Sequence, residues 1–502
     1  MKLYTTLIFI LSALISGRGQ NVNSDKFVGI DSAIHQLMEQ HHTVGLAVAV
    51  IEAGQITLSK GYGYRDLEAK TPVNAQTVFA IGSVSKGFTA ALLGKLEGKG
   101  ELRLTDRPAQ YIPELRFYNA LMDSTIQIRH LLSHSTGISS FPCDASSFLF
   151  SSDDRNDLIP RLAYLRPADG VGNQFRYNNF LYTVAGIIGE RITGDNWAAN
   201  LQSMIFEPLN MSQSYGNPLE AAKNTNFAKG YAVRNGQPVP VLQANIPTIA
   251  PGGTVHSNLQ DMTKWLMMWM REGRVDSTQL LPLEYVQAAT QPQQFMGVRP
   301  NAAETGGAHF QHYGYGWMCS DYYGYYKVEH SGDISGYCAN LVYYPAENIG
   351  IVVLSNQTSS NITYEVTKVL EDYLLPLERT VSDTTVVRYG EAHHLIPDTF
   401  QTAINDENPT SHALKDFVGV YNHGGFGNIR VTYENGILYA DFPFTKYRLQ
   451  HHESNVFLEH FSEEVPLVVW PFMEFDFVAN EEGVIDTLRL NFDNPLVEFK
   501  RI

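Results

Sequence analysis

Apolar side chains recur at every third or fourth position over residues 27–37, and this period predicts an amphipathic helix. Residues 44–51 and 55–61 are rich in strand-forming side chains and flank a short glycine-containing turn, which predicts a β-hairpin. A second helical pattern follows, with apolar residues at every fourth position from 88 to 96. The first part of the chain is therefore expected to fold as helix, hairpin and helix.

The middle of the chain, residues 110–320, reads as helices and loops broken by Gly and Pro. Strands return at 341–344 and 349–354 as a second hairpin, and residues 364–374 have the period of a closing helix. Strands at both ends of a helical middle predict one antiparallel sheet, built from the two ends of the domain and flanked by helices. This is an α+β fold.

The character of the sequence changes twice after this domain. Residues 376–411 are polar and aperiodic, which predicts a linker. Residues 412–502 carry alternating apolar positions and an Asn435-Gly436 turn, which predicts a small all-β domain. A chain of 502 residues is long enough for two domains, which we place at 26–375 and 412–502.

The first residues are typical of a secretory signal. Lys2 precedes an apolar stretch over residues 7–15, and small residues stand at Gly17 and Gly19. The stretch is too short to span a bilayer, so we expect a cleavable signal peptide over residues 1–19 and a secreted or periplasmic protein. No later segment is long and apolar enough for a transmembrane anchor, and no cysteine near the cleavage point could carry a lipid.

Charge and cysteine content narrow the functional classes. The formal net charge of -16 would repel the phosphates of a nucleic acid, so a small-molecule or peptide substrate is the better fit. The three cysteines, Cys143, Cys319 and Cys338, allow at most one disulfide. Cys319 and Cys338 either pair or stay as buried free thiols, and the sequence leaves both alternatives open.

Ser83 and Lys86 stand three residues apart at the first turn of the second predicted helix, so both side chains lie on one helix face. A serine hydroxyl needs a base to remove its proton, and a neutral lysine amine can be that base once burial or a neighbouring cation has lowered its pKa. The unpaired N–H groups of a helix start also favour an oxyanion near Ser83. A pair with this spacing is common by chance, so it needs support from other motifs.

Two further motifs supply the remaining groups. Tyr177 offers a phenol that can relay a proton, and Asn179 offers an amide that can orient a substrate carbonyl. His330 and Gly332 open the late strand pair, and the glycine lets a ligand lie close to the strand edge. The backbone N–H of Asp333, together with that of Ser83, would complete an oxyanion hole with two donors.

Together these motifs resemble the penicillin-recognising serine hydrolases, especially the class C β-lactamases and DD-peptidases. The resemblance covers roughly residues 26–375 and includes a His-x-Gly at His330 where β-lactamases usually carry Lys-Thr-Gly. Its other motifs and flanking stretches are Ser83 to Lys86, Tyr177 to Asn179, His130 to His134, Pro251 to Gly253 and Tyr313 to Trp317.

The resemblance implies an acyl-enzyme on Ser83, proton transfer shared by Lys86 and Tyr177, and substrate binding by Asn179 and His330, without a cofactor or metal. It also implies that residues 412–502 form the lipocalin-like β-domain that some members carry. In the members that carry a lysine, this side chain anchors the substrate carboxylate, whereas a histidine is mostly neutral at pH 7. Peptidase activity on D-amino-acid peptides or esterase activity is therefore expected before true β-lactamase activity.

Rival interpretations find less support. His130 and His134 stand four residues apart, but leucines fill the gap where a zinc-protease helix has a glutamate. Neither Ser83 nor Ser85 lies in the Gly-x-Ser-x-Gly of an α/β-hydrolase. The alternative of another class is a non-catalytic protein that binds peptidoglycan or acts as a scaffold. The sequence leaves the oligomeric state and the role of the β-domain open.

Overall fold

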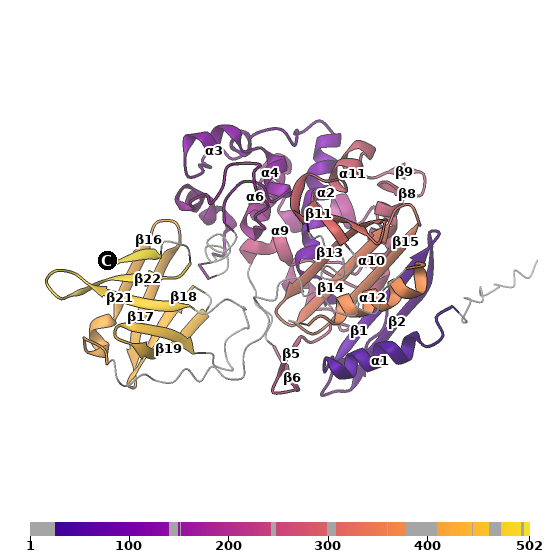
Figure 1. The fold of residues 1–502 in the computed structure, drawn as a ribbon. Coiled ribbons are helices and arrows are strands. Elements are labelled where there is room, and N and C mark those ends of the chain that lie inside the picture. Colours follow the sequence, from indigo (N-terminus) through magenta and orange to yellow (C-terminus); the bar gives the residue numbers. More distant parts are fainter. Residues whose placement is uncertain are drawn as a thin grey trace, which may run out of the picture.

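Figure 1 shows a large domain built on one sheet and a separate β-barrel, in the order that the sequence predicts. The predicted signal peptide, most of the predicted linker and Cys143 lie outside the residues that are described. This computed structural model describes residues 26–139, 149–150, 152–241, 247–298, 308–358, 360–377, 409–443, 445–460, 473–492 and 496–502.

The large domain contains a nine-stranded antiparallel sheet with the order β10-β11-β12-β13-β14-β15-β1-β2-β3. Strands from the two ends of the domain's chain are neighbours inside this sheet, because β1 pairs with β15 from Leu46↔Ser355 to Glu52↔Ile349. This arrangement confirms the α+β class and the sheet assembled from both ends of the domain. The strands are β1 Gly45–Glu52, β2 Gln55–Asp66, β3 Thr71–Pro72, β10 Gln294–Val298, β11 Ala308–Tyr313, β12 Met318–Tyr322, β13 Tyr325–Ile334, β14 Tyr337–Tyr344 and β15 Ile349–Ser355.

Both faces of the sheet are covered, which explains the unbroken apolar run of β1. Leu46 and Val48 face a cluster with α1 (Ile30–Gln40) and α12 (Ile362–Leu374). Ala47 and Ala49 face the larger cluster that includes α2 (Ser85–Gly98) and α10 (Leu259–Met270). Successive side chains of a strand point to opposite faces, so burial on both faces requires every position to be apolar.

The remaining helices and strands of this domain pack mainly into the cluster that contains α2. The helices are α3 Ala120–Thr125, α4 Ile128–Leu132, α6 Asn179–Thr193, α7 Trp197–Leu201, α8 Pro218–Ala221, α9 Ala250–Gly253 and α11 Leu283–Ala289, with 3₁₀ turns including η1 Gly82–Val84 and η3 Arg155–Tyr164. The short strand pairs are β4 Phe79–Ala80 with β7 His256–Ser257, β5 Tyr231–Arg234 with β6 Gln237–Pro240, and β8 Arg274–Val275 with β9 Thr278–Gln279.

Two strands at the edge of the sheet, β10 and β11, lie within the region that the sequence predicts as helix and loop. Their residues are largely exposed or half-buried, and they lack the regular alternation that marks a strand with one buried face. The prediction was therefore wrong for these strands, because an edge strand with little burial carries no clear apolar period.

The C-terminal domain is a closed antiparallel barrel of eight strands, which confirms the all-β prediction for this region. The turn at Asn435 and Gly436 has positive φ angles of 51° and 87°, the backbone conformation that Asn-Gly favours in a tight hairpin. The strands are β16 Gly419–His423, β17 Gly427–Glu434, β18 Ile437–Phe442, β19 Thr445–Glu453, β20 Val456–His460, β21 Glu474–Ala479, β22 Ile485–Leu490 and β23 Val497–Arg501.

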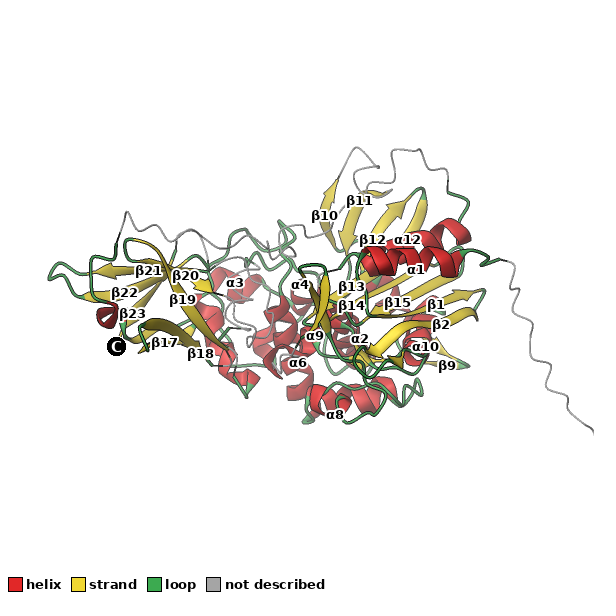
Figure 2. Cartoon of the chain, turned by 90° about the horizontal axis from the view of Figure 1, so that it is seen from below, coloured by secondary structure: helices red, strands yellow, loops and turns green. Residues whose placement is uncertain are grey.

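The barrel contacts aromatic side chains of the large domain, which include Tyr164, beside His423 of the barrel, and Phe150. It lies beside the helical part of the large domain, near α3, on the side away from the large sheet (Figure 2). Phe150 of the large domain is 1% exposed and is surrounded by four phenylalanines of the barrel. Their ring centroids lie 5.2 to 6.1 Å away, and they are Phe426, Phe442, Phe492 and Phe499.

Two other sequence expectations can be compared with the described residues. Cys319 and Cys338 are both buried and neither forms a disulfide, so the alternative of a bridge between them is not realised. None of the described helices combines the length and apolar character needed to cross a bilayer.

Candidate active site

The nucleophile candidate lies on a tight turn between β4 and α2. Ser83 belongs to η1, and α2 begins two residues later, so the serine precedes the α-helix instead of lying within its first turn as predicted. Gly82 has a φ of 51°, and a Cβ built there would lie 2.7 Å from the backbone nitrogen of Asp333. Only glycine fits this position, because the turn touches the backbone of β13.

Lys86 is fully buried and reaches three oxygen atoms. Its Nζ lies 2.9 Å from Ser83 Oγ, 2.6 Å from Asn179 Oδ1 and 2.7 Å from the Gly252 carbonyl oxygen. Three acceptors match the three N–H bonds of an ammonium group. A neutral amine would keep two of these bonds, to Asn179 and Gly252, and would turn its lone pair toward the hydroxyl of Ser83. The geometry therefore accommodates both protonation states of the lysine.

Helix α6 carries the second predicted motif to this lysine. Asn178 caps the helix by accepting the N–H of Leu181 at 3.1 Å, which places Asn179 at the first helical position. The Lys86 Nζ also lies 4.7 Å from the centroid of the Tyr177 ring. The Ser83–Lys86 motif and the Tyr177–Asn179 motif lie about 90 residues apart in the sequence, and the fold brings them together in one site.

Strand β13 forms the opposite wall. A Cβ at Gly332 would lie 1.9 Å from the Ile81 carbonyl oxygen and 3.0 Å from the Ser83 nitrogen, so the strand backbone packs directly against the serine turn. The pairing of β12 with β13 stops at Met318↔Glu329, and residues 330–334 extend past the end of β12. The carboxylate of the exposed Asp333 accepts hydrogen bonds from Thr358 Oγ1 at 2.8 Å and Cys338 Sγ at 3.0 Å.

His330 lies behind this wall and is 2% exposed. Its Nε2 is 2.8 Å from the Tyr313 hydroxyl and its Nδ1 is 2.6 Å from the Ser331 carbonyl oxygen, so both ring nitrogens are engaged within the protein. Burial, with a contribution from the charge of Lys86, lowers the pKa of His330 to about 3. The imidazole is therefore neutral at pH 7, and its predicted contact with substrate stays a prediction.

His134 is a site residue that the sequence analysis considered only as part of a flanking stretch and as one half of a metal-binding histidine pair. It is fully buried with a φ of 57°, and its Nδ1 accepts the N–H of Asn178 at 3.0 Å. Its ring lies 4.3 Å from that of Tyr177 and 4.7 Å from that of Tyr313. Burial lowers the pKa of His134 well below its usual value, so this imidazole supports the tyrosine wall in its neutral form.

The histidine pair considered for a metal does not form a metal site. His130 Nδ1 accepts the N–H of Gln127 at 3.1 Å, whereas His134 faces the tyrosines. Across the described part of the chain, no group of three or more His, Cys, Asp or Glu side chains is placed to hold a metal ion.

Comparison with known proteins agrees with this geometry. A family model described as "Beta-lactamase" matches residues 30–371. The chain belongs to the β-lactamase family. This places it among the penicillin-recognising serine hydrolases, and the matched range contains every residue of the site. Residues 405–501, which contain the barrel, match a second model described as a domain of unknown function, DUF3471.

The family relatives are distant. Protein flp of Staphylococcus aureus is 24% identical over 347 residues, which cover 68% of this chain and 65% of that protein. A β-lactamase of Escherichia coli is 32% identical over 237 residues, which cover 47% of this chain and 59% of that protein. An octameric penicillin-binding protein homologue from Pyrococcus abyssi is similar in structure, with a TM-score of 0.61, 22% identity, and coverage of 94% of this chain and 99% of that one.

Proposed function

We propose that this β-lactamase-family protein hydrolyses small peptides that contain D-amino acids, or carboxylic esters, through an acyl-enzyme on Ser83. The observation that carries the proposal is the 2.9 Å contact between Lys86 Nζ and Ser83 Oγ. The Asn179 and Gly252 oxygens fix the other two directions of the amine, which leaves the third for the serine. Acyl transfer by a serine uses a nucleophile beside a base, with the base oriented by a further group. Ser83, Lys86 and the oxygens of Asn179 and Gly252 have this arrangement.

In the first step, Ser83 Oγ gives its proton to Lys86 Nζ and forms a bond to the substrate carbonyl carbon. The carbonyl oxygen becomes an oxyanion, which the backbone N–H groups of Ser83 and Asp333 would stabilise. The close packing of Gly82 and Gly332 brings these two backbone segments together. The oxyanion then collapses and expels an amine or alcohol, which takes a proton from Lys86 or Tyr177. A water molecule hydrolyses the resulting ester and restores the serine.

The charge of the site favours substrates that need no cation beside the scissile carbonyl. His330 is neutral at pH 7 and both of its ring nitrogens are engaged, so it cannot replace the carboxylate-binding lysine of the β-lactamases that it resembles. Asp333, the next residue of β13 with an ionisable side chain, carries a carboxyl group and is exposed. We therefore place D-aminopeptidase and esterase activities before β-lactam hydrolysis, and we expect the enzyme to act outside the cytoplasm after removal of its signal peptide.

The nucleophile is tested with a fluorophosphonate probe. We expect the probe to label the wild-type protein and the Ser277→Ala control, whose serine is exposed in the β8–β9 turn, but not the Ser83→Ala protein. Equal labelling of the Ser83→Ala protein, or none of the wild type, would contradict the hydrolase proposal and favour the non-catalytic alternative. A panel of nitrocefin, D-Ala-D-Ala peptides, D-aminoacyl nitroanilides and short p-nitrophenyl esters then distinguishes the substrate classes.

The base is tested separately by the Lys86→Ala substitution. Removing a general base typically costs about 10²–10⁴-fold in rate, and we expect a loss of acylation in this range. Acylation close to the wild-type rate would instead assign the base to Tyr177.

A further inference from the structure

The carbonyl of Gly252 holds Lys86, and this carbonyl is itself held by neighbours outside the motifs. Gly252 belongs to α9, a four-residue turn of buried residues between α2 and α6. One turn after Lys86 on α2, the hydroxyl of Thr89 donates a hydrogen bond of 2.6 Å to the Pro251 carbonyl oxygen. A threonine within a helix more often bonds back to its own helix, so this bond across to α9 ties the two elements together.

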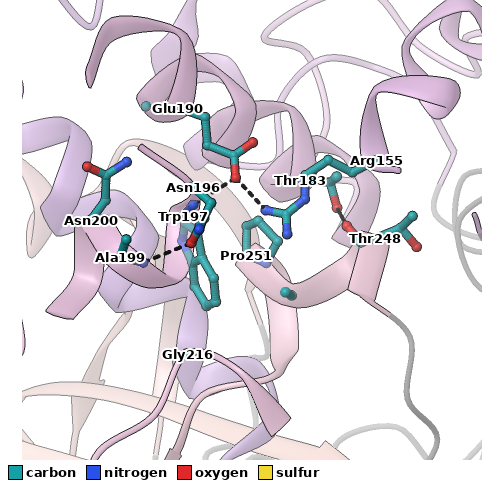
Figure 3. A network of polar contacts seen from close by, with 12 residues as sticks. Arg155, Thr183, Glu190, Asn196, Trp197, Ala199, Asn200, Gly216, Thr248 and Pro251 are labelled. Carbon is teal, nitrogen blue, oxygen red and sulfur yellow. Dashed lines mark hydrogen bonds and ion pairs between the residues drawn. The ribbon is translucent and has the colours of Figure 1, made fainter. Parts of the chain in front are cut away.

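Trp197 fixes the direction of that hydroxyl. Its indole Nε1–H donates to Thr89 Oγ1 at 3.0 Å, so the threonine oxygen accepts from the indole and has its own proton left for Pro251. The tryptophan is fully buried and lies beside Pro251 (Figure 3). Its backbone N–H donates to Glu190 Oε1 at 2.7 Å, and Glu190 forms an ion pair with Arg155 at 3.1 Å.

On its other side, α9 packs closely against α6. A Cβ at Gly186 of α6 would lie 2.4 Å from the Pro251 ring, and a Cβ at Gly252 would lie 3.3 Å from the Asn179 carbonyl oxygen. Contacts among α2, α6 and α9 therefore determine the positions of Lys86, Asn179 and Gly252. Within these contacts, the Thr89 hydroxyl connects α2 to Pro251, the residue before Gly252.

We propose that Thr89 is a positioning residue of the active site, oriented by Trp197, which holds the Gly252 carbonyl against Lys86. This inference rests on the proposed role of Lys86 as the base. When the hydroxyl is lost, the Pro251 carbonyl has no donor from α2, and the following carbonyl can turn away from Nζ. The amine then loses one of the two oxygens that aim its lone pair at Ser83.

The pH profile separates positioning from general stability. A hydrogen bond to the charged form favours that form, so a weaker bond from Lys86 to Gly252 makes deprotonation easier. The acylation rate rises with pH as Lys86 loses its proton, and this rise is the acid limb of the pH profile. The acid limb should move to lower pH in such a variant, while the maximal rate falls. The other titratable groups around Lys86 are the tyrosines Tyr177 and Tyr182 of the α6 region and the imidazoles of His134 and His330. The hydrogen bonds of the Thr89 hydroxyl go instead to Pro251 and Trp197.

The test compares Thr89→Val, which keeps the shape and removes the hydroxyl, with Thr89→Ser, which keeps the hydroxyl. Acylation of Ser83 by a fluorophosphonate is measured from pH 5 to pH 10. A misplaced catalytic group can cost on the order of 10²-fold, so we expect a loss up to that size and an acid limb at lower pH for the valine variant. The serine variant should keep the wild-type profile.

Thr183→Val is the matched control. Thr183 is equally buried, and its hydroxyl donates to the Thr248 carbonyl at 2.9 Å, in the turn that leads into α9 (Figure 3). It should lose stability without a shift of the acid limb. An unshifted limb in Thr89→Val, an equal shift in Thr183→Val, or no rescue by Thr89→Ser would overturn the proposal. If Thr89→Val does not fold, Trp197→Phe takes its place, with the same direction of change.

A readout without catalysis keeps this inference distinct from the proposed function. In Ser83→Ala protein, the titration of Lys86 is followed by the ¹³Cε resonance of labelled lysine, assigned by its absence in Lys86→Arg. Thr89→Val should lower the midpoint of this titration, and an unchanged midpoint would contradict the positioning role. A wild-type protein that the probe does not label would instead contradict only the hydrolase activity.

Discussion

The contact of Phe150 with the barrel predicts that the two domains unfold as coupled units. Phe150 is 1% exposed, although it belongs to the large domain, and the four rings around it belong to the barrel. Its carbonyl oxygen also accepts a bond of 2.6 Å from Arg161 of η3, which connects the contact to the large domain. Unfolding of either domain must therefore expose this side chain to water.

The magnitude follows from burial. Truncation of a fully buried phenylalanine to alanine costs about 3–5 kcal/mol. For a barrel of this size, about 1 kcal/mol moves the midpoint of thermal unfolding by about 4–8 °C, so the barrel transition of Phe150→Ala should fall by more than about 10 °C. Phe150→Leu, which fills most of the space, should lose about 1 kcal/mol.

The assay is scanning calorimetry of the full chain together with urea unfolding. Phe310→Ala, at a phenylalanine of β11 that is 51% exposed, is the control and should leave the barrel transition unchanged. A Phe150→Ala protein whose transitions stay within about 0.5 kcal/mol of wild type, the usual range for surface substitutions, would show that this contact does not hold the domains together.

Two further predictions concern a barrel carboxyl and the strand beside the nucleophile. Burial raises the pKa of Glu459 from 4.5 to about 8, so the folded barrel keeps a proton that the unfolded chain releases, and stability falls as pH rises between these values. The loss amounts to at most about 5 kcal/mol. Glu459→Gln should abolish this fall in urea midpoints measured at pH 5 and pH 9, and a fall equal to that of wild type would refute the assignment. Gly332→Ala places a Cβ against the Ile81 carbonyl and must displace β13 from Ser83, so we expect a loss of acylation of about 10²–10³-fold with little change in fold by circular dichroism. Normal acylation would show that β13 supplies no oxyanion donor.

Much of the framework could be predicted from the sequence because it depends on local patterns. The run of apolar residues in β1 and the hairpins around it have clear periods, and Asn435-Gly436 selects its own turn. The Ser83, Lys86, Tyr177 and Asn179 motifs could also be assigned to one site, since each carries a side chain whose chemistry is readable in the sequence.

The rest depends on contacts that leave no such pattern. The third acceptor of Lys86 is a backbone carbonyl 166 residues away, and a backbone carbonyl has no sequence signature. The four phenylalanine rings that surround Phe150 come from distant parts of the barrel sequence and meet only when the barrel has folded. His330 could be identified as a departure from the lysine-bearing relatives, but only the fold shows that the Tyr313 hydroxyl engages its ring.

The neutrality of His330 also narrows the ways in which Lys86 can become a base. A buried amine loses its proton either because burial disfavours its charge or because a second cation repels it. Burial lowers the pKa of His330 to about 3 and holds that of His134 well below its usual value, so neither neighbouring imidazole carries a charge at pH 7. Repulsion by an imidazolium is therefore absent, and the full burial of Lys86 is the observed property that disfavours its charge. The residues Ser83, Asn179 and Gly252, whose oxygens contact Lys86, lie outside β13. A change of residue at His330 can therefore alter the substrate while leaving the placement of the base to the helices.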